Sequence, residues 1–407
     1  MRRPRVLVLT TYYAPILGGV ETHARLIARW MHERGYETLV LTTRVGMDRP
    51  APPTVDGVPV HRTRPSGSRR QWAKWLALPF IFWALVRLRN RYDVVYCPDP
   101  RGVGVAAVTA RHLLSKRLVF QAATPGVLSC THWDGMLARA ALDPAGRLGR
   151  AIKSTGRRVY GAADAYVCIS QEISNEGRSA GIPERRMVYQ PHGVRLDRYR
   201  PAATDAVRRI RDELGLPRER IICLFLGRLS REKGVLDLVD AWRRVDDESA
   251  VLALAGPEMP GHHLDAGPQA RELVARYGLS ERVRFLGATD TPARVMQAAD
   301  VFVLPSYYEA FAIAVAEAMA CGLAPVVSPV AGIADHLDHG ENALLCEPGR
   351  PDHLAATLRR AIGDTALRVA LRRAARATAE RHFDGERMAA RIAGLLTDVA
   401  AFRREAA

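Results

Sequence analysis

The sequence predicts an α/β protein built from two doubly wound, Rossmann-like domains, and three observations support this prediction. The chain has 407 residues, which is more than a single hydrophobic core comfortably supports. Short apolar runs alternate with amphipathic stretches along the chain, a pattern typical of parallel sheets covered by helices on both faces. The alternation restarts after residue 201, so we expect domains at 1–201 and 202–384, followed by a helix at 385–407.

The first domain is expected to begin with a strand, a glycine turn and a helix. Val6–Leu9 is apolar, Gly18 and Gly19 supply the turn, and residues 22–34 have helical amphipathic periodicity. Residues 49–67 are rich in Pro and Gly and are expected to be mostly loop. The other strands of this domain are expected at 37–42, 58–61, 92–96, 118–121 and 165–169.

The second domain repeats the alternation and closes with a long helical segment. This final segment, residues 385–405, is long enough to lie across another element, and we expect it to return toward the N-terminal domain. The strands of the second domain are expected at 221–226, 251–255, 283–286, 301–304 and 324–327.

Composition excludes several classes of protein. No stretch reaches the roughly 20 apolar residues of a membrane-spanning helix, and the apolar run Val6–Leu9 is too short for a signal peptide, so we expect a cytoplasmic protein. The six cysteines are scattered, without a Cys-x-x-Cys pair or a histidine cluster at ligand spacing. This argues against a disulfide framework and against structural zinc.

The charge of the chain is unevenly distributed. The net charge is +16, and all of the excess positive charge lies in residues 1–200. This asymmetry indicates an anionic partner, such as a membrane surface, an acidic or phosphorylated acceptor, or nucleic acid. An arginine-rich proteome is the alternative, although it would not explain a neutral second half. Because no aromatic and basic nucleic-acid motif is present, we expect no nucleic-acid partner.

The segment 69–91 combines tryptophans with flanking cations. It contains Trp72, Trp75 and Trp83, and its composition is that of an interfacial membrane helix interrupted by Pro79. A helix covering the first sheet, with an apolar core face and basic ends, explains the same residues. Peripheral attachment to the inner face of the cell membrane is therefore one of two open interpretations. The cations concerned are Arg69, Arg70, Lys74, Arg87, Arg89 and Arg91.

The stretch 306–322 places two carboxylates at the ends of an otherwise small and apolar run. Glu309 should lie on the loop after the predicted strand 301–304, and Glu317 about one turn inside the following helix. If that helix begins near Ala312, its free N–H groups point back at the loop and could hold an anion. The alternative is an ordinary αβ unit whose glutamates pair with arginines.

Two further groups follow predicted strands, where ligands bind in doubly wound sheets. Arg228 and Lys233 follow strand 221–226, and together they could neutralise a diphosphate. Gly18 and Gly19 would let a ligand approach the backbone at the start of a helix, with Glu21 beside them. A solvated basic loop and a simple turn are the corresponding alternatives.

Taken together, these motifs resemble the family 4 retaining glycosyltransferases of the GT-B fold, in which two such domains face a cleft. The resemblance runs nearly end to end and includes 298–306, 317–322 and 340–342. It implies metal-independent transfer of a sugar from a UDP- or GDP-linked donor, with retention of configuration and no cofactor. The acceptor would be a glycan, a lipid-linked precursor or a small molecule.

The resemblance also implies roles for individual residues. Arg228 and Lys233 would bind the diphosphate, Glu309 the hydroxyls of the donor sugar, and Glu317 the ribose. Gly19 would meet the phosphate or the reacting sugar. The other residues placed at the donor by the motif match are Gly18, Phe311, Ala312, Ile313 and Leu286.

This chain departs from the family pattern at several positions. Relatives usually carry a histidine after the strand that corresponds to 118–121, and here none follows Gln121; His132 is a possible substitute. The family's Asn-Gly-Val-Asp signature begins here with His192. Ala310 and Ala312 replace glycines that are common beside the first glutamate, so side chains crowd the donor sugar.

Two other interpretations are weighed against a transferase. A nicotinamide-dependent oxidoreductase would use Gly102 and Gly104 in a Gly-x-Gly-x-x-Ala turn, but the next strand ends at Gln121 and not at the acidic residue that would bind a ribose. A catalytically degenerate scaffold that binds an anionic partner draws on the basic first half. The presence of Glu309 and Lys233 at their motif positions argues for an active enzyme.

Overall fold

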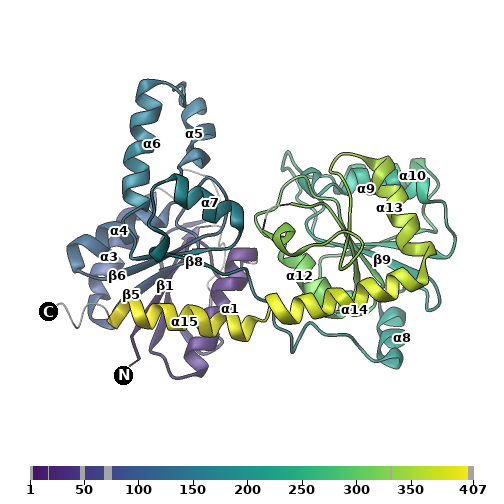
Figure 1. The fold of residues 1–407 in the computed structure, drawn as a ribbon, viewed down its shortest axis with the longest axis horizontal. Coiled ribbons are helices and arrows are strands. Elements are labelled where there is room, and N and C mark those ends of the chain that lie inside the picture. Colours follow the sequence, from purple (N-terminus) through teal and green to yellow (C-terminus); the bar gives the residue numbers. More distant parts are fainter. Residues whose placement is uncertain (1–2, 17, 46–50, 68–75, 331, 402–407) are drawn as a thin grey trace. The chain divides into compact units, whose positions relative to one another are not determined.

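The computed structural model describes residues 3–16, 18–45, 51–67, 76–330 and 332–401 (Figure 1). The chain divides into two compact units, residues 1–192 with 386–407, and residues 193–385. Each unit is a parallel sheet with helices, which confirms the predicted fold class. Residues 193–201 belong to the second unit, because the Val194 N–H donates to the Phe383 carbonyl and the Gly385 N–H donates to the Val194 carbonyl.

Unit 1 contains an eight-stranded sheet in the order β3-β4-β2-β1-β5-β6-β7-β8. Its neighbouring strands run parallel, apart from the antiparallel β3–β4 pair. The central strands are fully buried, which is why they appear in the sequence as continuous apolar runs. The strands are β1 Val6–Leu9, β2 Thr38–Val45, β3 Thr54–Val55, β4 Val58–Gly67, β5 Val94–Cys97, β6 Arg117–Ala122, β7 Ala165–Cys168 and β8 Met187–Tyr189.

Helix α15 (Gly385–Ala401) packs into the core of unit 1, which confirms that the C-terminal helix returns toward the N-terminal domain. Its buried side chains, among them Met388 and Ile392, share one cluster with Ile27 and Met31 of α1. The other helical segments are α1 Gly19–Glu33, α3 Leu78–Arg87, η1 Arg89–Arg91, α4 Val103–Leu114, η2 Thr131–Trp133, α5 Asp134–Arg139, α6 Arg147–Tyr160, α7 Gln171–Ser179 and η3 Glu184–Arg186.

One expectation for unit 1 is corrected. The stretch 49–67 is not mostly loop, because β4 occupies ten residues of it and pairs with β2, which places its apolar Val58 and Val60 in the core. Pro79 lies in the first turn of α3, where its missing N–H costs no hydrogen bond, and residues 68–75 before it lie outside the described residues. Trp72 and Trp75, on which the interpretation as an interfacial membrane helix rests in part, are therefore outside the described residues.

Helix α3 packs against α4, β2 and β4, as a helix covering the sheet would. Its buried face contains Ile81 and Leu85, whereas Phe80 and Trp83 are 46% and 60% exposed. The guanidinium of Arg87 lies 5.4 Å from the centre of the Trp83 ring. Among the described residues, no helix is long and apolar enough to cross a membrane.

Unit 2 contains a six-stranded sheet in the order β11-β10-β9-β12-β13-β14. Its neighbouring strands all run parallel. This order changes direction between β9 and β12, and ligands of doubly wound sheets bind at the carboxyl ends of the strands beside such a point. The strands are β9 Ile221–Leu226, β10 Ala250–Ala255, β11 Val283–Gly287, β12 Val301–Leu304, β13 Ala324–Val327 and β14 Leu344–Leu345.

The helices of unit 2 cover this sheet. Apolar residues at helical spacing bury one face of each, as in α9, where Leu238, Val239 and Trp242 are fully buried. The helical segments are α8 Thr204–Glu213, η4 Arg231–Lys233, α9 Val235–Val245, α10 Gly267–Arg276, α11 Pro292–Gln297, α12 Ile313–Ala320, η5 Ile333–His336, α13 Pro351–Gly363 and α14 Thr365–His382.

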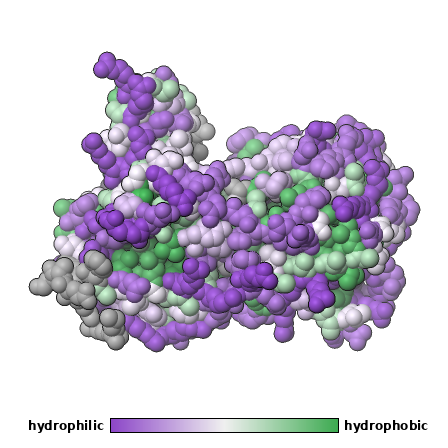
Figure 2. Space-filling model, viewed as in Figure 1, coloured by the Kyte–Doolittle hydropathy of each residue, from purple (hydrophilic) through white to green (hydrophobic). Residues whose placement is uncertain are grey.

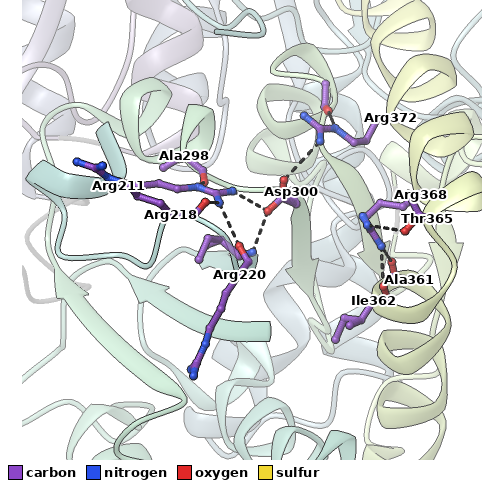
Figure 3. A network of polar contacts seen from close by, with 12 residues as sticks. Arg211, Arg218, Arg220, Ala298, Asp300, Ala361, Ile362, Thr365, Arg368 and Arg372 are labelled. Carbon is purple, nitrogen blue, oxygen red and sulfur yellow. Dashed lines mark hydrogen bonds and ion pairs between the residues drawn. The ribbon is translucent and has the colours of Figure 1, made fainter. Parts of the chain in front are cut away.

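A network of hydrogen bonds and ion pairs connects helices to the amino ends of β9 and β12 (Figure 3). The carboxylate of Asp300 accepts hydrogen bonds from the Ile222 N–H at 2.9 Å and from the buried Arg211 at 2.7 Å. Arg372 of α14 reaches the same carboxylate at 3.4 Å. Arg368 donates to carbonyls in the last turn of α13, which would otherwise lack partners. The network lies at the strand edge opposite the predicted ligand site.

Candidate functional site

The loops that follow β9 and β12 meet at the carboxyl edge of the sheet of unit 2. The contact is close because Gly234, with φ of 69°, has no side chain; a Cβ there would lie 2.2 Å from the carbonyl oxygen of Pro305. The Tyr307 N–H also donates to the Glu232 carbonyl at 2.9 Å. These contacts bring together the two loops that carry the predicted cations and the first predicted glutamate.

Lys233 and Glu309 form an ion pair between these loops. Their side chains are only 15% and 12% exposed, so the pair is largely shielded from water. The hydroxyl of Ser306, which is fully buried, donates to the same Glu309 oxygen at 3.1 Å. Each partner therefore holds the other in place, and a bound ligand could exchange these contacts for its own anionic and hydroxyl groups.

Arg228 lies on the same loop as Lys233 but is more exposed. Its guanidinium donates to Glu232 at 2.6 Å, with 50% of its own side chain exposed. An exposed pair of this kind contributes little to stability, so Arg228 can turn toward a ligand at low cost. The structure thus places both predicted cations on one loop, each already paired with a carboxylate.

The start of α12 completes this edge of unit 2. Ala312 precedes the helix in the left-handed conformation, with φ of 61° and ψ of 58°, and Ile313 is the first helical residue. The first N–H groups of a helix have no partner within it, so this end can hold an anion. Phe311 is buried, where its ring packs edge-on against Phe383, and Ile313 is partly buried.

Glu317 lies one turn inside α12, as the sequence predicted. Burial raises the pKa of its carboxyl to about 7, although a hydrogen bond from the Tyr199 hydroxyl and the charge of Arg198 act in the opposite direction. Tyr199 itself is buried. At neutral pH this carboxyl is therefore close to its titration midpoint, which is unusual for a glutamate.

The loop after β10 approaches the β9 loop just as closely. A Cβ on Gly256, whose φ is 140°, would lie 1.9 Å from the Gly227 carbonyl oxygen. The Gly256 N–H donates to the Gly287 carbonyl at 2.7 Å. Leu286, at the end of β11, is partly buried beside this loop. At the ends of these strands, the chain segments therefore contact each other directly through their backbones.

The glycine pair lies in unit 1, at the start of α1. Gly18 is the residue before the helix, with extended backbone, and Gly19 is its first residue; both are exposed. The side chain of Glu21 folds back over this turn, so that a Cβ on Gly18 would lie 2.2 Å from a Glu21 carboxylate oxygen. Because that oxygen is the end of a flexible side chain and the backbone of Gly18 is extended, another residue at position 18 would only require Glu21 to move aside.

His192 lies inside unit 1 and not at its surface. Its Nδ1 is 3.0 Å from Nδ1 of His23, whose Nε2 is 2.7 Å from the Tyr96 hydroxyl. That hydroxyl is in turn 2.6 Å from the amide oxygen of Gln121. Burial lowers the pKa of His192 to about 4, so this buried network is uncharged at neutral pH. His192 therefore supports the fold beneath α1.

His132 is partly buried in the η2 turn. Its Nδ1 lies 2.8 Å from the Gly126 carbonyl oxygen, and its ring lies against those of Trp133 and Tyr160. Burial lowers the pKa of its imidazole, against the opposing effect of the Gly126 hydrogen bond. Because a carbonyl oxygen only accepts, Nδ1 carries the proton of the neutral ring, and Nε2 can then only accept a hydrogen bond.

Three residues of the unit 2 site were missed by the sequence interpretation. Ser306 and Glu232 lie within the motifs themselves, so their nearness in sequence to Glu309 and Arg228 could have identified them as site residues. Tyr199 carries no local signal, because only the fold brings it to Glu317. In the described part of the chain, no group of three or more His, Cys, Asp and Glu residues could hold a metal ion.

The unit 2 site therefore combines cations, a helix N-terminus and two carboxylates. The cations and the helix end suit an anionic group such as a diphosphate. The carboxylates accept hydrogen bonds and suit hydroxyl groups. One ligand that carries both kinds of group would engage the whole arrangement.

Comparison with known proteins gives matches to two family models. Residues 206–378 match the model described as glycosyl transferases group 1, and residues 17–198 match that of glycosyltransferase family 4. The two matches span most of unit 2 and unit 1 and include Arg228, Lys233, Glu309 and Glu317, whereas β1 and Tyr199 lie outside them.

Curated relatives and a solved structure extend over most of the chain. A D-inositol 3-phosphate glycosyltransferase of Catenulispora acidiphila is 30% identical over 87% of this chain and 85% of its own length. An uncharacterized glycosyltransferase of Methanocaldococcus jannaschii is 26% identical over 89% of this chain and 90% of its own. The Anabaena protein HepE, solved in complex with UDP and glucose, has a TM-score of 0.77 at 22% identity, covering 97% of this chain and 99% of its own.

Proposed function

We propose a reaction for this chain, which belongs to the group 1 and family 4 glycosyltransferases. It moves a sugar from a nucleotide-diphosphate donor to an acceptor hydroxyl, with retention of configuration and without a metal ion. The observation that carries this proposal is the shielded Lys233–Glu309 pair at the carboxyl edge of the sheet of unit 2. A UDP-linked donor is favoured, because the similar Anabaena protein was solved with UDP.

The leaving diphosphate is the group that needs most stabilisation in such a transfer. When the bond from the anomeric carbon to the diphosphate breaks, negative charge grows on the diphosphate. We propose that Lys233 and Arg228 neutralise this charge, together with the N-terminus of α12. These cations would perform the role that a divalent metal performs in other enzymes.

The two carboxylates are proposed to bind hydroxyl groups. Glu309 would accept hydrogen bonds from the donor sugar once the diphosphate attracts Lys233, and Glu317 would accept them from the ribose. Neither is proposed as a general base; the departing diphosphate is proposed to accept the acceptor's proton. Phe311, Ala312, Ile313 and Leu286 are proposed to shape the donor site in unit 2. Gly18 and Gly19 remain proposed donor residues on the motif match alone.

The test is to incubate the purified protein with UDP-glucose, UDP-galactose, UDP-N-acetylglucosamine and GDP-mannose, with candidate acceptors, and to follow release of the nucleoside diphosphate. We expect Lys233→Ala and Glu309→Ala each to lower turnover at least 100-fold, which is about 3 kcal/mol of transition-state stabilisation. The matched control is Arg276→Ala, which breaks an exposed ion pair with Glu272 in the same unit. Unchanged turnover in the site variants would refute the assignment.

Two further measurements test the mechanism. Turnover should persist in excess EDTA, and loss of turnover that added metal restores would contradict a metal-independent reaction. The NMR coupling of the product's anomeric proton should match that of the donor, and an inverted product would contradict retention.

We also propose that unit 1 associates with an anionic surface, such as the inner face of the cell membrane. The support is the basic first half of the chain and the exposed Phe80 and Trp83 of α3, beside Arg87. Co-sedimentation with phosphatidylglycerol vesicles should exceed that with phosphatidylcholine vesicles and should fall in the Trp83→Ala variant. Equal sedimentation with both kinds of vesicle would refute the proposal.

A further inference from the structure

Unit 2 has a second concave site, on the loops that carry the donor residues but with different side chains. A cavity of about 370 Å³ lies at the start of α9, within the size range of small-molecule sites. Neither Lys233 nor Glu309 lines it. The lining side chains used below are Arg231, Glu232, Leu236, Asp237, Leu264 and Tyr307.

Tyr307 gives this pocket an aromatic wall that is both exposed and fixed. The residue is 51% exposed, although its hydroxyl donates to Asp237 at 2.5 Å and its N–H donates to Glu232 at 2.9 Å. Gly349, with φ of 70°, packs so closely that a Cβ there would lie 3.2 Å from the ring. A ring already held in one orientation loses little conformational entropy when a ligand stacks on it.

The polar groups of the pocket favour a neutral ligand that is rich in hydroxyl groups. Asp237 and Glu232 each use one oxygen in the contacts described, with Tyr307 and Arg228, and each carboxylate can accept further hydrogen bonds. Arg231 donates to Gln269 at 2.7 Å and has further donors available. Two carboxylates against one guanidinium disfavour an anion, while Leu236, Leu264 and the ring of Tyr307 offer apolar surface to the C–H groups of a ligand.

We propose that this pocket binds a neutral saccharide, with one sugar ring stacked on Tyr307 and its hydroxyl groups bonded to Asp237 and Glu232. An aromatic face suits the C–H face of a sugar ring, and carboxylates suit its hydroxyl edge. This saccharide site adjoins the donor site proposed above, because Glu232 lines the pocket and also pairs with Arg228, but it does not depend on the transfer reaction. It would hold part of a glycan while the donor site remains free for the nucleotide.

The test uses the full chain with saturating UDP and a panel of neutral trisaccharides, composed of α- and β-linked glucose, galactose and mannose. Saturation-transfer NMR reports binding at millimolar concentration. At least one trisaccharide should bind with UDP present, and Tyr307→Ala and Asp237→Ala should each weaken it at least 10-fold. The matched control is Tyr308→Ala, which removes the neighbouring tyrosine, 54% exposed and outside the pocket, and should leave binding unchanged.

Three outcomes would overturn the proposal: no binding by any member of the panel, displacement of the trisaccharide by UDP, or equal weakening by the Tyr307→Ala and Tyr308→Ala variants. Circular dichroism of each variant checks that the fold is retained, and Tyr307→Phe provides a second variant that keeps the ring. Failure of the protein to bind UDP would instead count against the proposed function, so the two failures can be told apart.

Discussion

Replacing Glu317 by glutamine should remove a pH dependence from the stability of unit 2. Burial raises the pKa of this carboxyl from 4.5 to about 7 in the folded protein. The side chain lies inside α12, where the Tyr199 hydroxyl donates to it. Glutamine has nearly the same shape and can accept the same hydrogen bond, but it does not titrate.

The sign follows from the direction of the shift. Because the folded pKa lies above the unfolded value, the folded protein holds the proton more tightly between pH 4.5 and 7. The resulting stabilisation is complete below the unfolded pKa and is lost as pH rises through the folded pKa. A shift of this size corresponds to about 3 kcal/mol of unfolding free energy.

The assay is urea unfolding of the wild type and the Glu317→Gln variant at pH 4.5, 6 and 8, followed by circular dichroism. Since both proteins share all other titrating groups, the difference between them isolates Glu317. We expect the variant to gain about 3 kcal/mol relative to the wild type between the lowest and highest pH. Glu281→Gln, which removes a carboxylate 93% exposed, should show no such trend. A difference that stays constant with pH would refute the reasoning.

Three other substitutions test the local geometry of unit 2. Ala312→Gly should raise the unfolding free energy by roughly 0.5–1 kcal/mol, because φ of 61° strains an alanine; lower stability in urea would contradict that conformation. Gly256→Ala should cost at least 2 kcal/mol or prevent folding, because a Cβ there would meet the Gly227 carbonyl oxygen at 1.9 Å; an unchanged melting temperature would show that the loops are further apart. Arg211→Ala should cost about 3 kcal/mol, because Asp300 loses a buried partner, and a loss below 1 kcal/mol by urea unfolding would mean that the ion pair is not needed.

Much of the fold could be predicted from continuous apolar runs. The strands β9, β12 and β13 occupy the predicted residues, because buried parallel strands need apolar side chains on both faces. The short strands β8 and β14 were not predicted, since two or three residues carry no periodicity. β4 was predicted over 58–61 only, because the proline and glycine at 65 and 67 favour a loop by local composition, whereas the strand continues to Gly67 beside β2.

The candidate site was only partly visible in the sequence. Glu309, Glu317, Arg228 and Lys233 stand out because charged residues beside apolar strands need a reason to be there. His192 was a candidate by its place in a motif, which could not show that its side chain is buried against His23. The difference arises because a motif gives the position of a side chain along the chain but not the direction in which it points.

The sequence by itself determined that the chain folds into two parallel α/β domains and belongs to a glycosyltransferase family, because both follow from local patterns and motif spacing. Only the tertiary structure decided which charges meet. Lys233 pairs with Glu309 across 76 residues, because the loops after neighbouring parallel strands converge at one edge of the sheet. Tyr199, from the segment before α8, reaches Glu317 inside α12. The raised pKa of Glu317 has the same origin, since burial is a property of packing and not of the sequence around a residue.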